Sequence, residues 1–148
     1  MEIISIEKYK ERLSRVIQGV KPITSKIISQ KKEQIIDLNR ETQLFFDGID
    51  SKGKLLQGYT NFTIEIKRSK GQVFNRTTLK DTGDFYNSFR LEYDSEKYVV
   101  KLFAIDEKTP KLIAKYGMDI FGLTQDNRNY LDLNIIKPEL DKWIYSKL

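Results

Sequence analysis

The side-chain chemistry open to this chain is limited, because the sequence contains no histidine and no cysteine. The commonest general base, the thiolate nucleophile and the usual zinc ligands are therefore missing. Four aspartates remain as possible Mg²⁺ ligands for phosphodiester chemistry, Asp81, Asp84, Asp119 and Asp126. The acidic residues of the chain do not recur in pairs at a spacing that could hold two metal ions. The sequence thus predicts no enzyme, no cofactor, no metal and no small-molecule substrate.

Two of these aspartates lie in the run TLKDTGDFYNSF, residues 78–89, where a structural role accounts for them. Asp81 or Thr82 is a suitable helix N-cap, and a carboxylate at Asp84, near N2 or N3, interacts favourably with the helix N-terminus. Phe85 and Phe89 then share one face of the helix, and a glycine at position 83 lets another backbone approach. The run predicts a capped helix that packs two phenylalanines into a core.

A second set of residues alternates aromatic and basic side chains, as surfaces for single-stranded nucleic acid do. Its members are Tyr59, Phe62, Lys67, Arg68, Lys70, Phe74 and Arg76. The chain has a net charge of +5, and residues 1–74 hold 14 Lys and Arg against 9 acids, whereas residues 75–148 hold 12 of each. The excess charge is compatible with a nucleic acid, with an acidic protein partner, or with a solvated helix face.

The elements that must position these residues can be predicted from hydrophobic periodicity. Residues 5–18 repeat apolar side chains at spacings of three and four, and Gly19 and Pro22 are expected to end this helix before a second one, from about residue 24 to 46. Residues 61–70 are compatible with a strand or with a short helix capped by Asn61 or Thr60.

The second half of the chain has clearer signals. Residues 89–104 alternate as a β-hairpin, residues 109–116 form a short helix with Thr109 as its cap, and DIFGLT follows as a short strand or loop. Residues 127–147 are expected to close the fold as a helix that Pro138 kinks or divides.

This order of elements predicts an α+β fold, a small antiparallel sheet with a central hairpin packed against several helices, with long N-terminal and C-terminal helices. A chain of 148 residues is expected to be a single domain, with a helical part over 1–47, an exposed loop over 48–60, and the motif helix, hairpin and C-terminal helix over 61–148. We expect no membrane contact, because the apolar runs are short. The N-terminus does not have the pattern of a secretory signal, so we expect the protein to stay in the cytoplasm or in a particle assembled there.

Three segments together resemble a known family. TLKDTGDFYNSF is similar to the L-x-x-T-G-x-L-x-x-S-F/I signature of the phage virion-morphogenesis and tail-completion proteins, relatives of the neck proteins of long-tailed bacteriophages. In that family a hairpin and a Y-G-x-x-x-F-G-L type segment follow, and this chain has KYGMDIFGLT at 115–124. The upstream run FFDGIDSKGKLLQGYTNFTIEIKRSKGQ resembles the family's loop and Thr-rich helix, which favours a helix over 61–70. The resemblance covers residues 40–148 in order.

The chain departs from the family at two points. The family's usual histidine before the glycine is replaced by Tyr116, with Lys115 beside it, and its P-A-R-P-F run becomes GMDIF. These differences place the chain in a divergent branch.

The resemblance implies a non-enzymatic structural subunit of a tailed-phage or prophage virion, assembled in the cytoplasm of the bacterial host. Its station would be the head–tail junction (the neck) or the top of the tail, where tail-completion proteins sit. It implies a homo-oligomeric ring of about six copies by analogy with tail symmetry. The partners are then other copies of the chain and neighbouring proteins of the head–tail connector or tail tube. The N-terminal positive charge would face an acidic partner ring or passing genomic DNA. The alternative function is a small basic nucleic-acid-binding module.

Two groups of residues are expected to carry these roles. The residues expected to hold the motif helix and to turn the chain into its last helix are Leu79, Thr82, Gly83, Phe85, Phe89, Tyr116, Gly117, Phe121 and Gly122. The loop 48–60, together with the C-terminal segment, is the candidate interface, with Ile49, Lys52, Lys54, Leu55, Leu56 and Tyr59 as its named residues.

Overall fold

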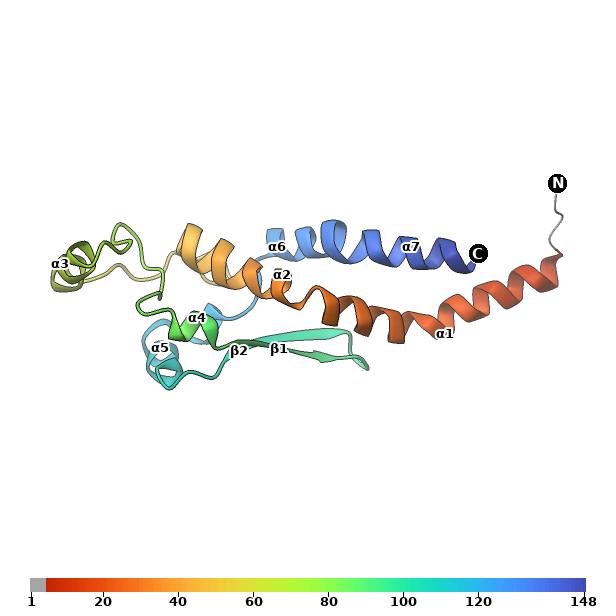
Figure 1. The fold of residues 1–148 in the computed structure, drawn as a ribbon, viewed down its shortest axis with the longest axis horizontal. Coiled ribbons are helices and arrows are strands. Elements are labelled where there is room, and N and C mark those ends of the chain that lie inside the picture. The colour runs from red at the N-terminus through yellow and green to blue at the C-terminus, as the bar shows by residue number, and fades with distance from the viewer. Residues whose placement is uncertain (1–4) are drawn as a thin grey trace.

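Two long helical segments run antiparallel along the molecule, and one β-hairpin packs beside them (Figure 1). The computed structural model describes residues 5–148. The N-terminal segment consists of α1 (Ile6–Gln30), α2 (Lys32–Asp37) and the π-helical η1 (Leu38–Asp47). The C-terminal segment consists of α6 (Gln125–Tyr130), the π-helical η3 (Leu131–Ile136) and α7 (Lys137–Lys147). The predicted α+β class is confirmed.

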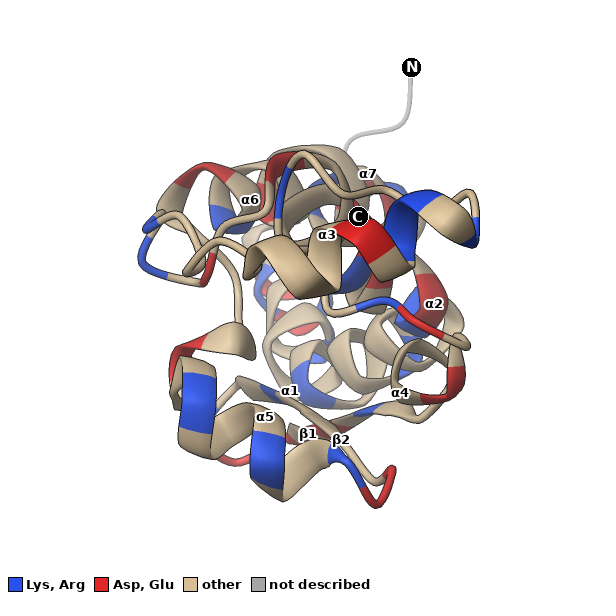
Figure 2. Cartoon of the chain, turned by 90° about the vertical axis from the view of Figure 1, so that its left-hand side faces the viewer, with Lys and Arg blue, Asp and Glu red and all other residues tan. Residues whose placement is uncertain are grey.

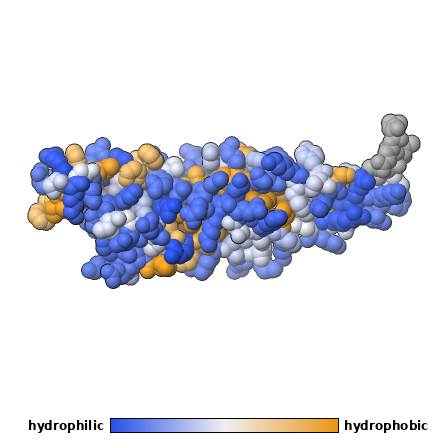
Figure 3. All heavy atoms as spheres, in the orientation of Figure 1, coloured by the Kyte–Doolittle hydropathy of each residue, from blue (hydrophilic) through white to orange (hydrophobic). Residues whose placement is uncertain are grey.

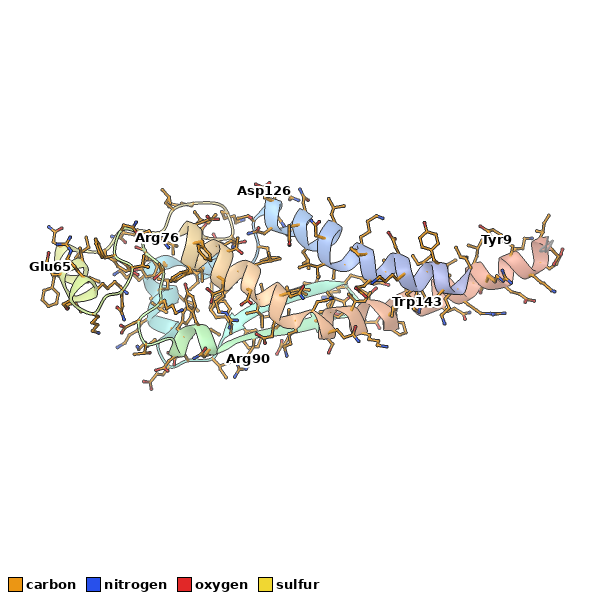
Figure 4. All side chains as sticks on the ribbon, turned by 45° about the horizontal axis from the view of Figure 1, so that its top comes forward. Tyr9, Glu65, Arg76, Arg90, Asp126 and Trp143 are labelled. Carbon is orange, nitrogen blue, oxygen red and sulfur yellow. The ribbon has the colours of Figure 1, made fainter. Side chains whose placement is uncertain are left out.

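The helix α1 continues through Gly19 and Pro22, so the predicted break there is wrong. The reason at Gly19 is tertiary packing, because a Cβ at this position would lie 2.5 Å from two ring atoms of Trp143. The glycine lets α7 approach α1, and partial burial of the indole against α1 offsets the low helix propensity of glycine. Figure 4 shows Trp143 between these helices and Tyr9 on the end of α1 that projects past α7.

The C-terminal segment begins two residues earlier than predicted, because Thr124 is its N-cap and accepts a hydrogen bond from the Asn127 N–H at 3.2 Å. Pro138 lies in the first turn of α7, directly after the wide π turns of η3. A proline in that position leaves fewer backbone hydrogen bonds unmade than one in a helix interior. Where the sequence predicted a kink or a division at Pro138, the structure changes from π-helix to α-helix.

The hairpin pairs β1 (Phe89–Asp94) with β2 (Val99–Ala104), with Phe89 opposite Ala104 and Asp94 opposite Val99. Its inner face joins a core with the N-terminal and C-terminal segments. This core consists of Ile28, Ile35, Ile36, Leu38, Leu44, Leu79, Phe85, Tyr86, Phe89, Leu91, Leu102, Ile120, Leu131 and Ile135. The predicted hairpin is confirmed.

Four short elements complete the fold: α3 (Asn61–Ser69), α4 (Asp84–Asn87), α5 (Thr109–Tyr116) and the 3₁₀ turn η2 (Met118–Ile120). Thr60 caps α3 by accepting from the Thr63 N–H at 3.2 Å, which confirms a helix over 61–70. The DIFGLT segment is a 3₁₀ turn followed by a loop. Among residues 5–148, no helix is both long and apolar enough to span a membrane.

Candidate binding site

The first motif forms a strained turn that leads into α4. Leu79 is buried with a backbone φ of 61°, a conformation that non-glycine residues rarely adopt. Gly83, with a φ of 95°, occupies the N-cap position, so the prediction of Asp81 or Thr82 as the cap is wrong. The left-handed backbone at Gly83 places Thr82 one residue before the cap, where its hydroxyl accepts from the Asp84 N–H at 3.3 Å.

An aromatic cluster brings the two motifs together in space. The ring of Phe85 lies 5.2 Å from that of Phe89 and 6.1 Å from that of Phe121, and Phe89 and Phe121 are 5.5 Å apart. Such tilted contacts stabilise beyond simple burial, by roughly 0.5–1.5 kcal/mol a pair. Phe85, Phe89 and Phe121 are therefore core residues that join residues 79–89 to residues 116–122.

Two buried amide side chains of η1 fix the second motif, and the sequence had not singled them out. Asn39 donates to the Ile120 carbonyl at 2.9 Å and accepts from the Gly122 N–H at 3.0 Å. Gln43 donates to the Gly122 carbonyl at 2.9 Å and accepts from the Thr124 N–H at 2.9 Å. Both amides are 0% exposed. Their hydrogen bonds hold the irregular backbone of residues 120–124 in place of a regular ladder.

The remaining residues of the second motif shape the turn after α5. Gly117 has a φ of 89° and donates its N–H to the Ile113 carbonyl at 2.8 Å, which ends the helix. Gly122 has a φ of 112°, and a Cβ there would lie 3.3 Å from the side chain of Ser51, so glycine is required on both grounds. The ring of Tyr116 is partly buried beneath the Lys115 ammonium, 5.2 Å from its centroid.

The loop 48–60 is tied to the body of the molecule at its base and exposed at its tip. The Ser51 N–H donates to the Asp119 carbonyl at 2.7 Å, and the buried Asp50 carboxylate accepts from the Lys52 and Lys54 backbone N–H groups at 2.9 Å each. Of the candidate interface residues, Lys52, Lys54 and Leu55 are exposed, whereas Ile49, Leu56 and Tyr59 are partly buried.

A pocket of about 270 Å³ lies where α3, the strained turn and α5 meet. Five motif residues line it, namely Leu79, Thr82, Gly83, Phe85 and Tyr116. Four lysines, Lys67, Lys70, Lys80 and Lys108, line it as well, against one carboxylate, Asp81. The sequence had assigned Lys67 and Lys70 to a basic and aromatic run, but not to a cavity.

The Asp81 carboxylate is held in its charged form by its neighbours. A hydrogen bond from Gln72 lowers the pKa of Asp81, and the nearby Lys70 and Lys108 lower it further against the opposing effect of burial. The Nζ atoms of Lys70 and Lys108 lie 3.5 and 4.0 Å from its oxygens. Asp81 therefore acts as an ion-pair partner at the rim of the pocket.

Most of the net positive charge of the chain belongs to residues 48–83, which include α3 at the end of the molecule that faces the viewer in Figure 2. Residues 48–83 contain seven Lys and Arg and three Asp and Glu, and seven minus three gives +4 of the chain's +5. Several of these bases cover aromatic rings of the same chain, with Lys67 4.8 Å above Tyr59 and Arg68 4.8 Å above Phe74. A base of this chain therefore covers one face of each of these two rings, and a nucleobase cannot stack on that face.

The four aspartates considered as metal ligands are not brought together as a site. Within residues 5–148, no group of three or more acidic side chains has a geometry that could hold a metal ion. A scan against models of protein families, a search of curated proteins and a search of solved structures each found no match.

Proposed function

We propose that this chain is a non-enzymatic structural subunit of a tailed-phage or prophage virion that assembles with copies of itself and with neighbouring virion proteins. Its station would be the head–tail neck or the top of the tail. Support comes from the ordered resemblance over residues 40–148, whose two motifs meet in one aromatic cluster.

The observation that carries an assembly role is an apolar stripe on the N-terminal half of α1. Ile6, Tyr9, Leu13 and Ile17 follow one another at helical spacing and are 71%, 49%, 37% and 75% exposed. Further along the helix the same face buries Ile27 and Ile28. Fully burying one such aliphatic side chain stabilises by roughly 1.5–3 kcal/mol, so several together can support a subunit contact. Figure 3 shows further apolar atoms at the α3 end and along the middle of the molecule.

Light scattering of the purified chain across concentration, at low and high salt, tests this role. We expect discrete oligomers that persist in salt, because apolar contacts are not screened. Leu13→Glu should dissociate them, whereas Ser14→Glu introduces the same charge at the neighbouring exposed position and should leave them intact. A wild-type chain that stays monomeric at every concentration and salt would contradict self-assembly through this stripe.

The +4 charge of residues 48–83 favours a second candidate, a basic nucleic-acid-binding module. That function requires an affinity for DNA or RNA that falls steeply with salt, because binding releases counterions. An electrophoretic mobility assay with single- and double-stranded DNA over a range of salt separates the two candidates. A retarded band that disappears at moderate salt, from a protein that remains monomeric, favours the second.

A further inference from the structure

The pocket between α3 and α5 holds a lysine that, among residues 5–148, has no carboxylate within ion-pair distance. Lys67 is only 7% exposed, and its Nζ donates one hydrogen bond, to the Lys80 carbonyl at 2.9 Å. The face of Tyr59 lies 4.8 Å from the same ammonium. Among residues 5–148, no carboxylate lies within 4.0 Å of it, since Asp81 pairs with Lys70 and Lys108 instead. An ammonium has three donors, and a buried charge is stabilised chiefly by an opposite charge.

A second polar group of the pocket, the side-chain amide of Gln72, has an acceptor that lacks a donor. The Gln72 side-chain nitrogen donates to the Asp81 carbonyl at 3.0 Å and to its carboxylate at 3.2 Å, which fixes the orientation of the amide. Its oxygen, Oε1, is buried and has no donor. The Gln72 backbone N–H donates to the Lys67 carbonyl at 2.9 Å, so the two residues are adjacent. Both residues line the pocket, one with a cationic donor and the other with an acceptor that has no donor.

Part of the pocket wall is apolar. Ile66, Leu79, Phe85 and Leu112 line it together with the two polar groups. Its volume of about 270 Å³ far exceeds the roughly 10–15 Å³ that one water molecule needs, and it suits a group the size of one amino-acid residue. Inorganic anions would fill the charged part and leave the apolar wall uncovered.

We propose that this pocket binds an N-acylated apolar amino acid through its free carboxylate, the chemistry presented by the last residue of a polypeptide. The carboxylate pairs with Lys67, the acylated N–H donates to Gln72 Oε1, and the side chain covers the apolar wall. Asp81 keeps Lys70 and Lys108 at the rim and repels a second anion. The inference does not depend on a role in virions.

The test is a ¹H–¹⁵N NMR titration of the full chain with N-acetylphenylalanine. We expect saturable shifts at residues lining the pocket with a Kd of roughly 1 mM, the range for a ligand of this size. N-acetylphenylalaninamide, which lacks the carboxylate, and N-acetylglycine, which lacks the apolar side chain, should each bind about tenfold more weakly or worse. Equal binding of either analogue, or saturation of the same shifts by inorganic phosphate, would overturn the proposal.

Variants and a peptide arm sharpen the result. Lys67→Met should weaken binding about tenfold or more, whereas Lys111→Met removes a charge from the same helix as Leu112 but outside the pocket lining and should change the Kd less than about twofold. The comparison of analogues needs no variant, so it decides the question even if Lys67→Met does not fold. A tetrapeptide that ends in phenylalanine distinguishes the two sources of the ligand. If it binds more tightly than N-acetylphenylalanine, the natural ligand is the C-terminus of a polypeptide; if it does not, the natural ligand is a free N-acylated amino acid. No binding of either would refute the proposed site.

Discussion

Replacing Gln43 by methionine removes both polar atoms from the buried amide that holds residues 120–124 while keeping the side-chain length. Three groups then lose their partner, the Gly122 carbonyl, the Thr124 N–H and the Asn127 side chain. The Asn127 side chain can turn to water, which leaves two partly buried backbone groups without a partner at about 1–3 kcal/mol each. The more apolar side chain recovers part of this loss, so we expect a net decrease of about 2–4 kcal/mol in the free energy of unfolding.

Urea titration followed by fluorescence measures this decrease, because the single tryptophan, Trp143, lies between α1 and α7 and reports their separation. Gln30→Met is the matched control at an exposed position of α1, and it should change the free energy of unfolding by less than about 0.5 kcal/mol. Amide hydrogen exchange should also accelerate at Thr124 in the variant. A decrease below about 1 kcal/mol for Gln43→Met, or unchanged exchange at Thr124, would refute the assigned role of this amide.

Three further outcomes are expected. Gly19→Ala should destabilise the wild type by crowding Trp143, but should raise the free energy of unfolding of a Trp143→Leu variant by up to about 1 kcal/mol in urea titrations. Destabilisation of similar size in both proteins would instead indicate a helix end at Gly19. Burial raises the pKa of Tyr86 well above its usual value near 10, so above pH 10 only the unfolded state loses this proton. The free energy of unfolding should therefore fall above pH 10 by about 1.4 kcal/mol per pH unit more in the wild type than in Tyr86→Phe, and equal slopes would contradict this. The hydrogen bond from Gln72 lowers the pKa of Asp81, so its contribution to stability is present above about pH 4 and lost below; thermal unfolding should show a shallower acid dependence in Asp81→Asn, and an unchanged one would contradict it.

The elements predicted best were those with local signals of their own. The hairpin over 89–104 alternates with period two, and the helix over 109–116 carries Pro110 in its first turn, so short-range sterics and side-chain alternation determine them. The prediction failed at Gly19, where glycine normally indicates a helix end. A contact with Trp143, 124 positions further along the chain, decides the outcome there, and no local pattern contains that contact.

The candidate site divides in the same way. The sequence predicted Leu79, Gly83 and Tyr116 to be motif residues that hold a helix and form a turn, but it did not predict that they line a pocket. Lys67 was visible only as one base in a basic and aromatic run. Its burial beside Gln72 depends on how α3 lies against the strained turn, which is a property of the assembled fold.

The sequence by itself determined the class of fold and the chemistry that is absent. Composition excludes histidine and cysteine chemistry. Periodicity specifies helices and a hairpin, because it depends only on side chains near one another in the chain. Only the tertiary structure decided that the N-terminal helix is continuous, that Asn39 and Gln43 hold the second motif, and that Lys67 is buried in the lining of a pocket. These features arise from burial and hydrogen bonds between residues distant in sequence, whose energies exceed local propensities once the chain is folded.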